Sequence, residues 1–448
     1  MQRRQWLKTM GSAALGLALP AIASRVYALP AQAGARFLLV FLRGGYDAAS
    51  VLVPAGSDFY YASRPNIAIR RPPAPDADAD PNAAVALASA FGADSAARAI
   101  GDWALHPALA PSLLPLWQQG QLAFVPFAGT HDLSRSHFET QDGIEAGLSG
   151  DGTDRQALAA LRGSGFLNRL AQAMGGQGAP VAFTDGLPLV LAGPRDVPNV
   201  SLKGTGRAPF DARQASLLAQ MYRGTRFESL IDEGFELRET VARQAQAEVR
   251  AQMQSDGMAG AGQPSMASRQ QEMQAASRRA LSARGFEVEA RRMAGLMRER
   301  FNLGFIDVGG WDTHVNQGGA QGQLAGLLDN LGRGLSAFAA EMGPAWNQTT
   351  VVVLSEFGRT FRENGTRGTD HGHGTVYWVL GGAVRGGRIA GEQVAVEAAT
   401  LNQNRDWPVR NEYRALLGGL FRRLYGLDAG RLAQVFPGVA AGREIGLV

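Results

Sequence analysis

Five short stretches of the chain are apolar without interruption, and each ends in glycine and polar residues. They are RFLLVFLRGGYD (residues 36–47), QLAFVPFAGTHD (121–132), APVAFTDG (179–186), NLGFIDVGGWDTH (302–314) and TTVVVLSEFGR (349–359). Runs of four to eight apolar residues without alternation, rich in Val, Phe and Leu, are typical of strands buried on both faces of a parallel sheet. A buried helix could produce one such run, but five of them favour strands.

Helical patterns separate these runs. One is HPALAPSLLPLWQQG from His106, and another is QLAGLLDNLGRGLSAFAAEM from Gln323. The alternation predicts an α/β fold with a doubly wound, mostly parallel sheet flanked by helices. We expect residues 35–448 to form a single domain of this kind. Residues 227–301 read as helical around the link SDGMAGAGQPSMA, which predicts a helical insertion within that domain.

The first 28 residues have the pattern of an export signal. Arg3 and Arg4 precede a short apolar run, and small residues follow at positions 21–23 and 26–28. This layout predicts a signal peptide over residues 1–28, and RRQWLK further resembles the twin-arginine export signal. A structural N-terminal helix is the alternative. We therefore expect a periplasmic or secreted protein, with no membrane span after signal removal, because no later stretch offers about 18 uninterrupted apolar residues.

Charge and cysteine content narrow the possible functions. The 448 residues carry a net charge of +4, but Arg3, Arg4, Lys8 and Arg25 account for it, and without them 40 basic residues face 40 acidic ones. A neutral chain with no dense basic stripe lacks the electrostatic attraction that nucleic-acid binding requires, so we exclude that partner. The absence of cysteine excludes disulfides, iron–sulfur clusters, zinc–thiolate sites and cysteine nucleophiles.

Polar residues collect just after the predicted strands. Asp47, the group from His131 to His137, the pair Asp312 and His314, and Glu356 all occupy such positions. Ligands bind at this edge of open α/β sheets, where strand ends and helix starts converge. Five of the six histidines lie in these groups or in TDHGHG (residues 369–374). The sequence therefore predicts one shared site.

Two of these groups have the spacing of metal ligands. In GGWDTH, Asp312 and His314 are two residues apart, so an extended backbone points both side chains the same way. Imidazole with carboxylate suits zinc or manganese. The same spacing relates His371 to His373, which follow Asp370, and the interposed glycines would let the backbone approach a ligand closely. A helix cap beside a buried histidine, or a polar glycine-rich loop, are the alternatives.

Candidate nucleophiles and anion-binding groups lie in THDLSRSHFET and SEFGR. Ser134 and Ser136 could supply a hydroxyl, and Arg135 or Arg359 could hold an oxyanion. A Ser–His–Asp arrangement is a further reading, although the G-x-S-x-G pattern is absent. Alternatively, one of the serines caps a helix and Glu356 pairs only with Arg359.

The motifs FLRGGYD, SRSHF, GGWDTH, SEFGR and DHGHG, behind a twin-arginine signal, resemble those of the bacterial domain-of-unknown-function 1501 (DUF1501) family. The order of the groups is also similar to that of the alkaline phosphatase and sulfatase superfamily. This resemblance implies an alkaline-phosphatase-like core and a divalent metal, zinc first, with manganese or calcium as alternatives. The metal ligands that the resemblance implies are Asp47, Asp312, His314, Glu356 and either His371 or His373. With Asp370 from TDHGHG, the candidate metal ligands are Asp47, Asp312, His314, Glu356, Asp370, His371 and His373. Phe357 stands where the superfamily has a histidine, which His371 or His373 would replace.

Three functions follow as hypotheses. The first is an exported metal-dependent hydrolase whose substrate is a small phosphate or sulfate ester. The second is a non-catalytic metal- or anion-binding or assembly protein with a degenerate site of the same kind. The third is a metal-free serine hydrolase, which would react with fluorophosphonates and be indifferent to chelators.

Overall fold

The computed structural model describes residues 34–74, 76–87, 103–152, 163–202, 219–225, 285–439 and 445–448, with the pair 281–282 and the single positions 217, 228, 231 and 234. The helices of the site and core are α1 (Ala48–Val51), α2 (Asp58–Ser63), α4 (Ala110–Gln118), α5 (His137–Ala146), α7 (Phe166–Ala173), α11 (Phe286–Glu299), α12 (Gln323–Met342), α13 (Tyr413–Tyr425) and α14 (Ala429–Val435). The long strands are β1 (Arg36–Leu42), β5 (Leu122–Gly129), β8 (Leu303–Gly309), β9 (Thr349–Ser355) and β10 (Thr375–Leu380). Short strands are β2 (Leu52–Pro54), β3 (Val85–Ala86), β4 (Trp103–Leu105), β6 (Pro180–Ala182), β7 (Leu281–Ser282), β11 (Arg388–Ile389) and β12 (Asn411–Glu412).

The main sheet has the order β11-β5-β10-β9-β1-β8-β6, so the first strand of the chain lies at its centre. β1 pairs in parallel with β8 and β9, with Val40 opposite both Ile306 and Val353. β10 runs antiparallel to its neighbours β9 and β5. The long strands other than β10 therefore end at one edge of the sheet, and β10 begins at that same edge. The loops at these strand ends therefore lie along the same edge of the sheet.

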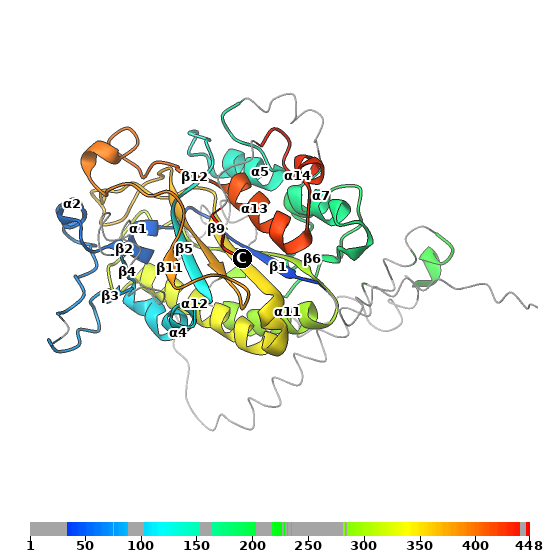
Figure 1. Ribbon diagram of the computed structural model, residues 1–448, viewed down its shortest axis with the longest axis horizontal. Coiled ribbons are helices and arrows are strands. Elements are labelled where there is room, and N and C mark those ends of the chain that lie inside the picture. The colour runs from blue at the N-terminus through cyan, green and yellow to red at the C-terminus, as the bar shows by residue number, and fades with distance from the viewer. Residues whose placement is uncertain are drawn as a thin grey trace, which may run out of the picture.

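Helices cover both faces of the sheet (Figure 1). Leu38, Val40 and Leu42 of β1 join the core formed with α4, α11 and α12. Phe37, Leu39 and Phe41 point to the opposite side and join the core formed with α7, α13 and α14. Because successive side chains of a strand point to opposite faces, a strand between two helical layers must be apolar at every position.

Helix α12 illustrates how the pattern specifies its element. Its buried large side chains recur every three or four residues, at Leu324, Leu328, Leu331, Leu335 and Phe338. This spacing places them on one stripe of a helix with 3.6 residues per turn. The stripe packs against α11 and the sheet.

The sequence predictions about the fold are confirmed at the level of a mixed α/β structure with a mostly parallel central sheet between helices. All five apolar runs form strands, and α12 begins and ends where QLAGLLDNLGRGLSAFAAEM does. Among the long strands, the one that was missed is β10, whose sequence TVYWVL directly follows TDHGHG, and the short strands other than β6 were missed as well. Most of the predicted insertion at 227–301 and the whole predicted signal peptide lie outside the described residues. Helix α11, within the former range, belongs to the core.

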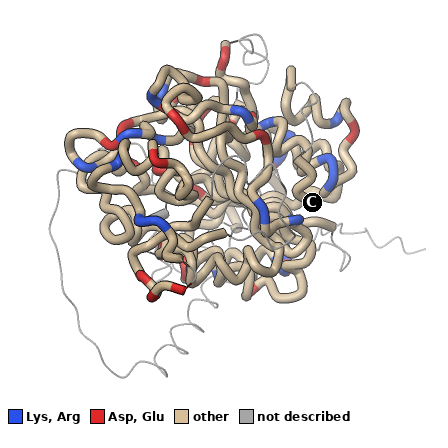
Figure 2. The backbone as a smooth tube through the Cα atoms, turned by 60° about the vertical axis from the view of Figure 1, so that its left-hand side comes forward, with Lys and Arg blue, Asp and Glu red and all other residues tan. Residues whose placement is uncertain are grey.

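Basic and acidic positions are interspersed along the tube (Figure 2). None of the described helices is long and apolar enough to cross a membrane.

Candidate metal centre

Four connecting segments meet at the edge where the parallel strands end. Three follow β1, β5 and β8, and the fourth, residues 356–374, leads from β9 to the antiparallel β10. The loop after β8 carries Asp312 and His314, and the loop before β10 carries His371. His137 is the first residue of α5, and the side chain of Ser136 caps this helix by accepting a hydrogen bond from the Glu139 backbone N–H.

Three imidazoles surround one carboxylate. His371 Nε2 lies 3.0 Å from His137 Nε2 and 3.1 Å from His314 Nε2. Asp312 Oδ1 lies 2.8 Å from His314 Nε2 and 3.3 Å from His371 Nε2, and its Oδ2 lies 3.6 Å from His137 Nε2. We call His137, Asp312, His314 and His371 the His/Asp cluster. All four side chains thus present their polar tips to one point.

The other ring nitrogen of each histidine faces an oxygen acceptor. His137 Nδ1 lies 2.7 Å from Glu356 Oε1, His371 Nδ1 3.1 Å from the Arg135 carbonyl oxygen, and His314 Nδ1 3.3 Å from Asp370 Oδ1. Each acceptor favours the tautomer with the proton on Nδ1, which turns the Nε2 lone pair toward the cluster. Metal-bound histidines have this arrangement, with a carboxylate or carbonyl behind the ring.

Asp312 is held ionised. Burial alone would raise its pKa, but hydrogen bonds to the three histidines and the charge of Arg359 lower the pKa far below the usual aspartate range. Arg359 donates from Nη2 to Asp312 Oδ1. The lowered pKa keeps the carboxylate anionic, and it favours cations beside it.

Two of the histidines that face Asp312, His137 and His314, have a raised pKa. Burial would lower the pKa of His137, but hydrogen bonds to Asp312 and Glu356 and their charges raise it to about 9. The hydrogen bond to Asp312 likewise raises the pKa of His314. Without a metal, the cluster thus attracts protons to the Nε2 atoms. A cation or a proton is needed there, since lone pairs directed at one another repel.

The cluster is open to solvent on one side. The His137 side chain is 9% exposed and packs against Phe357, with ring centroids 4.8 Å apart. His371 and His314 are 28% and 38% exposed. A structural zinc site is usually closed, whereas a catalytic one keeps a position for water or substrate. The exposed side provides such an approach.

The donor set fits a divalent metal. Zinc takes imidazole nitrogens at 2.0–2.1 Å, so two nitrogens bound in tetrahedral geometry lie about 3.3 Å apart. The observed separations of 3.0 and 3.1 Å between Nε2 atoms are close to this value. His137, Asp312 and His371 form a group that could hold a metal ion, and His314 Nε2 faces the same point.

One family model matches the part of the chain that contains this cluster. A family model described as "Protein of unknown function (DUF1501)" matches residues 35–436. The chain belongs to the DUF1501 family. No curated protein and no solved structure matches it. Because the description of DUF1501 names no activity, function must be argued from the site.

Two predicted ligands of this DUF1501 protein lie behind the cluster. Glu356 is fully buried and accepts hydrogen bonds at Oε1 from His137, from Gly44 N at 2.8 Å and from Gln141 Nε2 at 2.9 Å. Asp370 accepts at Oδ1 from Asn364 Nδ2 at 3.0 Å and faces His314. Both carboxylates orient histidine rings.

The structure places Asp47 apart from the cluster. Its two oxygens accept hydrogen bonds from Arg64 at 2.6 and 2.9 Å, and Oδ2 also accepts from Ser50 and Gln317. Burial would raise the pKa of Asp47, but the charge and hydrogen bonds of Arg64 lower it. Asp47 is thus the buried partner of an arginine.

His373 is likewise not brought into the cluster. Burial and the charge of Arg135 lower its pKa to about 4. The neighbouring Gly372 and Gly374 do permit a close approach, but to backbone: a Cβ atom at Gly372 would overlap Arg359, and one at Gly374 would overlap Pro408. The two glycines therefore let this loop pack closely against other backbone segments of the protein.

The predicted nucleophiles and anion-binding groups have internal partners. Ser134 Oγ donates to Asp132 Oδ2 at 3.0 Å. Ser136 caps α5, which is the alternative role that the sequence suggested for one of the two serines. Arg135 donates to Asp406 and Gln403. Arg359 is fully buried and donates to backbone carbonyls, among them Thr369 O at 3.0 Å, as well as to Asp312.

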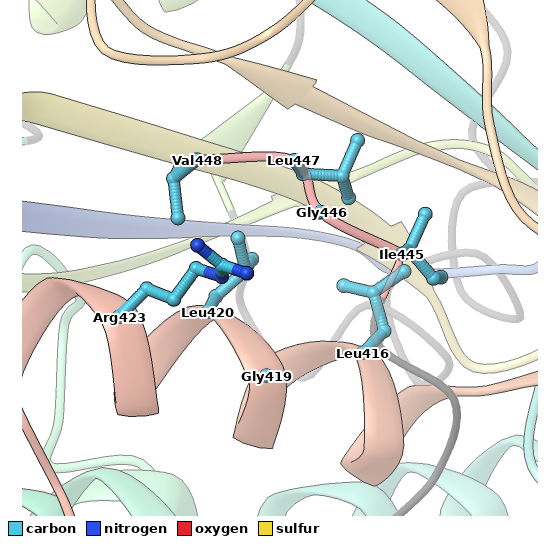
Figure 3. Close-up of a pocket in the computed structure, with 8 residues that line it drawn as sticks. All are labelled: Leu416, Gly419, Leu420, Arg423, Ile445, Gly446, Leu447 and Val448. Atoms are coloured by element: carbon cyan, nitrogen blue, oxygen red, sulfur yellow. The ribbon is translucent and has the colours of Figure 1, made fainter.

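His137 is the cluster member that the predicted ligand set lacked. The sequence did indicate that His137 could lie at the site, because SRSHF places this histidine directly after a potential helix cap in the segment that follows β5. The site does not coincide with the small cavity between α13 and the C-terminal residues 445–448 (Figure 3). That cavity is lined by Leu416, Leu420 and Arg423 of α13, and no member of the His/Asp cluster lines it.

Proposed function

We propose that the protein is an exported metal-dependent hydrolase of small phosphate or sulfate esters, with one divalent metal, zinc first, held by the His/Asp cluster. The observation that carries the proposal is the common orientation of His137, His314 and His371. Each ring has Nδ1 on an oxygen acceptor and Nε2 toward Asp312. Such ordering of three rings from three separate loops is what metal ligation requires.

A bound divalent metal supplies a Lewis acid that polarises an ester oxygen and lowers the pKa of water. The chain's own residues fix the geometry for this chemistry. Arg359 holds the Asp312 carboxylate from the buried side, and Glu356 holds the His137 ring. The exposed sides of His314 and His371 leave room for a small anionic ester to approach from solvent.

Water is the nucleophile that these contacts favour. The Ser134 hydroxyl is engaged with Asp132, and the Ser136 hydroxyl accepts from the first turn of α5. Reaction at either serine would first require breaking these contacts. Asp370, whose side chain is 53% exposed, contacts His314 at Nδ1, so in this proposal it orients the ring that faces the attacking water.

The superfamily relationship to alkaline phosphatases and sulfatases is part of the proposal. It is supported by the order of the groups along the chain and by their arrangement at the C-terminal ends of parallel strands. Twin-arginine export, which carries folded and often metal-loaded proteins, agrees with a metal site assembled from distant loops.

A second candidate is a non-catalytic metal- or anion-binding protein. One observation favours it: Arg359 and Arg135, the expected oxyanion clamps, donate to internal acceptors. In that case metal would bind but no ester would be turned over.

Metal analysis by mass spectrometry on the exported protein tests the proposal first. The wild type should carry one equivalent of zinc, manganese or calcium, and His314→Ala/His371→Ala should lose it. His131→Ala, which removes an exposed histidine outside the cluster, is the matched control. Phosphatase and sulfatase substrates are then screened with and without chelator.

The outcomes separate the three functions. Hydrolysis that is abolished by chelation and restored by metal supports the hydrolase. Metal without turnover supports the binding protein. Chelator-insensitive turnover with fluorophosphonate labelling of Ser134 or Ser136 would make it a serine hydrolase.

A further inference from the structure

The loops that carry His314 and His371 run side by side. Thr369 N donates to Thr313 O at 3.3 Å, Asn316 N to Thr366 O at 2.9 Å, and Gln317 N to Arg367 O at 3.0 Å. These backbone hydrogen bonds join residues 313–317 to residues 366–369. The two segments come from opposite sides of α12 and β9 in the chain, so their register is set only in the folded protein.

Gln317 joins the same two loops through its side chain. Its Oε1 accepts a hydrogen bond from Thr313 Oγ1 at 2.9 Å and another from Thr369 Oγ1 at 2.9 Å. Gln317 and Thr369 are fully buried, and Thr313 is 1% exposed. Thr313 stands between Asp312 and His314, and Thr369 stands two residues before His371. One amide oxygen therefore links both ligand-bearing segments.

A buried ion pair anchors this amide from behind. Gln317 Nε2 donates to Asp47 Oδ2 at 2.6 Å, and Asp47 is paired with Arg64. Arg64 Nε in turn donates to the Phe361 carbonyl oxygen at 2.7 Å. Fixed at both ends, the Gln317 side chain has one available orientation.

We propose that Gln317 is a positioning residue of the metal centre, which holds the Thr313 and Thr369 hydroxyls so that His314 and His371 converge. The inference rests on the proposed metal centre and not on hydrolase activity. Gln317 touches no member of the His/Asp cluster and acts through the two threonines. Asp47 and Arg64 fix the Gln317 amide. Asp47 therefore contributes to the metal centre by holding Gln317, and not as a metal ligand.

The experiment removes the two hydroxyls while keeping side-chain shape. In Thr313→Val/Thr369→Val the Gln317 oxygen loses both donors but the Gln317–Asp47 contact remains. Thr313→Ser/Thr369→Ser keeps both donors. Thr350→Val is a matched control, because the Thr350 hydroxyl is buried and has no hydrogen-bond partner among the described residues. Each metal-free protein is titrated with zinc against a chromophoric chelator, and its Tm is recorded.

We expect the double valine variant to bind zinc about tenfold more weakly, within the range for changes to residues that orient ligands. The serine pair and Thr350→Val should bind as the wild type does. Cobalt(II) in the double valine variant should have a shifted visible spectrum, since this spectrum reports ligand geometry. A merely structural role would lower the Tm but leave the spectrum unchanged.

Zinc affinity and a cobalt spectrum equal to those of the wild type in the double valine variant would overturn the inference while leaving the metal centre intact. A wild-type protein that binds neither metal would overturn the centre and this inference together. Failure of every ester substrate, by contrast, affects only the proposed hydrolase activity.

Discussion

His137 Nδ1 lies 2.7 Å from Glu356 Oε1, which joins the first turn of α5 to the residue that follows β9, 219 positions further along the chain. Glu356 accepts two further hydrogen bonds at the same oxygen and one from Ser355 at Oε2. The carboxylate is therefore held by contacts other than that with the histidine. An imidazole held in this way keeps its Nε2 lone pair toward Asp312.

Replacement of this acceptor should weaken metal binding. In Glu356→Gln the side chain keeps its shape but loses the charge that orients His137, and we expect the zinc affinity to fall about 10- to 100-fold. Glu139→Gln removes an exposed carboxylate from the same helix α5 and serves as the control. Isothermal titration calorimetry of both variants checks this. Equal affinities would mean that Glu356 is not part of the centre.

The stability of the metal-free protein should depend on pH through His137. Its folded-state pKa of about 9 lies above the ordinary value of 6.5, so the folded state binds the proton more tightly than the unfolded state. The resulting stabilisation, at most about 3 kcal/mol, is fully present below pH 6.5 and is lost as the pH rises through 9. Bound metal replaces the proton and should remove this dependence.

Thermal unfolding between pH 6 and 9.5, with chelator and with zinc, measures this effect. His137→Gln should flatten the decline seen in chelator, and His131→Ala should retain it. A decline of equal size in the zinc-loaded and metal-free proteins would assign the titration to another group.

Loss of Asp47 should destabilise the fold strongly. Arg64 is fully buried, and Asp47→Leu would leave its charge unpaired, at a cost of about 3–5 kcal/mol. The double variant Asp47→Leu/Arg64→Met removes both charges and should be more stable than the single variant. Urea denaturation of the wild type and the variants forms a double-mutant cycle. Additive losses would show that the pair is not coupled.

The glycine between the two histidines of TDHGHG should be intolerant of a side chain. A Cβ atom at Gly372 would overlap the Arg359 backbone, so Gly372→Ala should lower stability by about 1–3 kcal/mol and reduce the metal content. Gly365→Ala, where no atom lies within 4 Å of the added carbon, is the control. Differential scanning calorimetry with metal analysis compares the two. Equal Tm values would indicate that the loop can move away.

Much of the fold and part of the site could be predicted from local sequence. The strands β1, β5, β6, β8 and β9 correspond to uninterrupted apolar runs. The buried stripe of α12 follows from the three- and four-residue spacing of its apolar side chains. The positions after parallel strands collect at one edge by geometry alone, which is why Asp312, His314 and residues around His137 were expected together. These inferences need only neighbours in sequence and the rules of sheet packing.

Only the tertiary structure decided which partner each polar group has. The antiparallel β10 places the loop before it at this edge, and the path of that loop brings His371, and not His373, to Asp312. The pairing of Asp47 with Arg64, and of Arg359 with loop carbonyls, depends on loops whose order in the sequence does not give the distance between them. Apolar burial is nondirectional and leaves a periodic trace in sequence, whereas a hydrogen bond or a metal ligand is directional and depends on atoms hundreds of residues away. The sequence alone therefore determined the strands of the sheet and the edge at which the polar residues lie. The tertiary structure determined which of those residues contact one another in the His/Asp cluster.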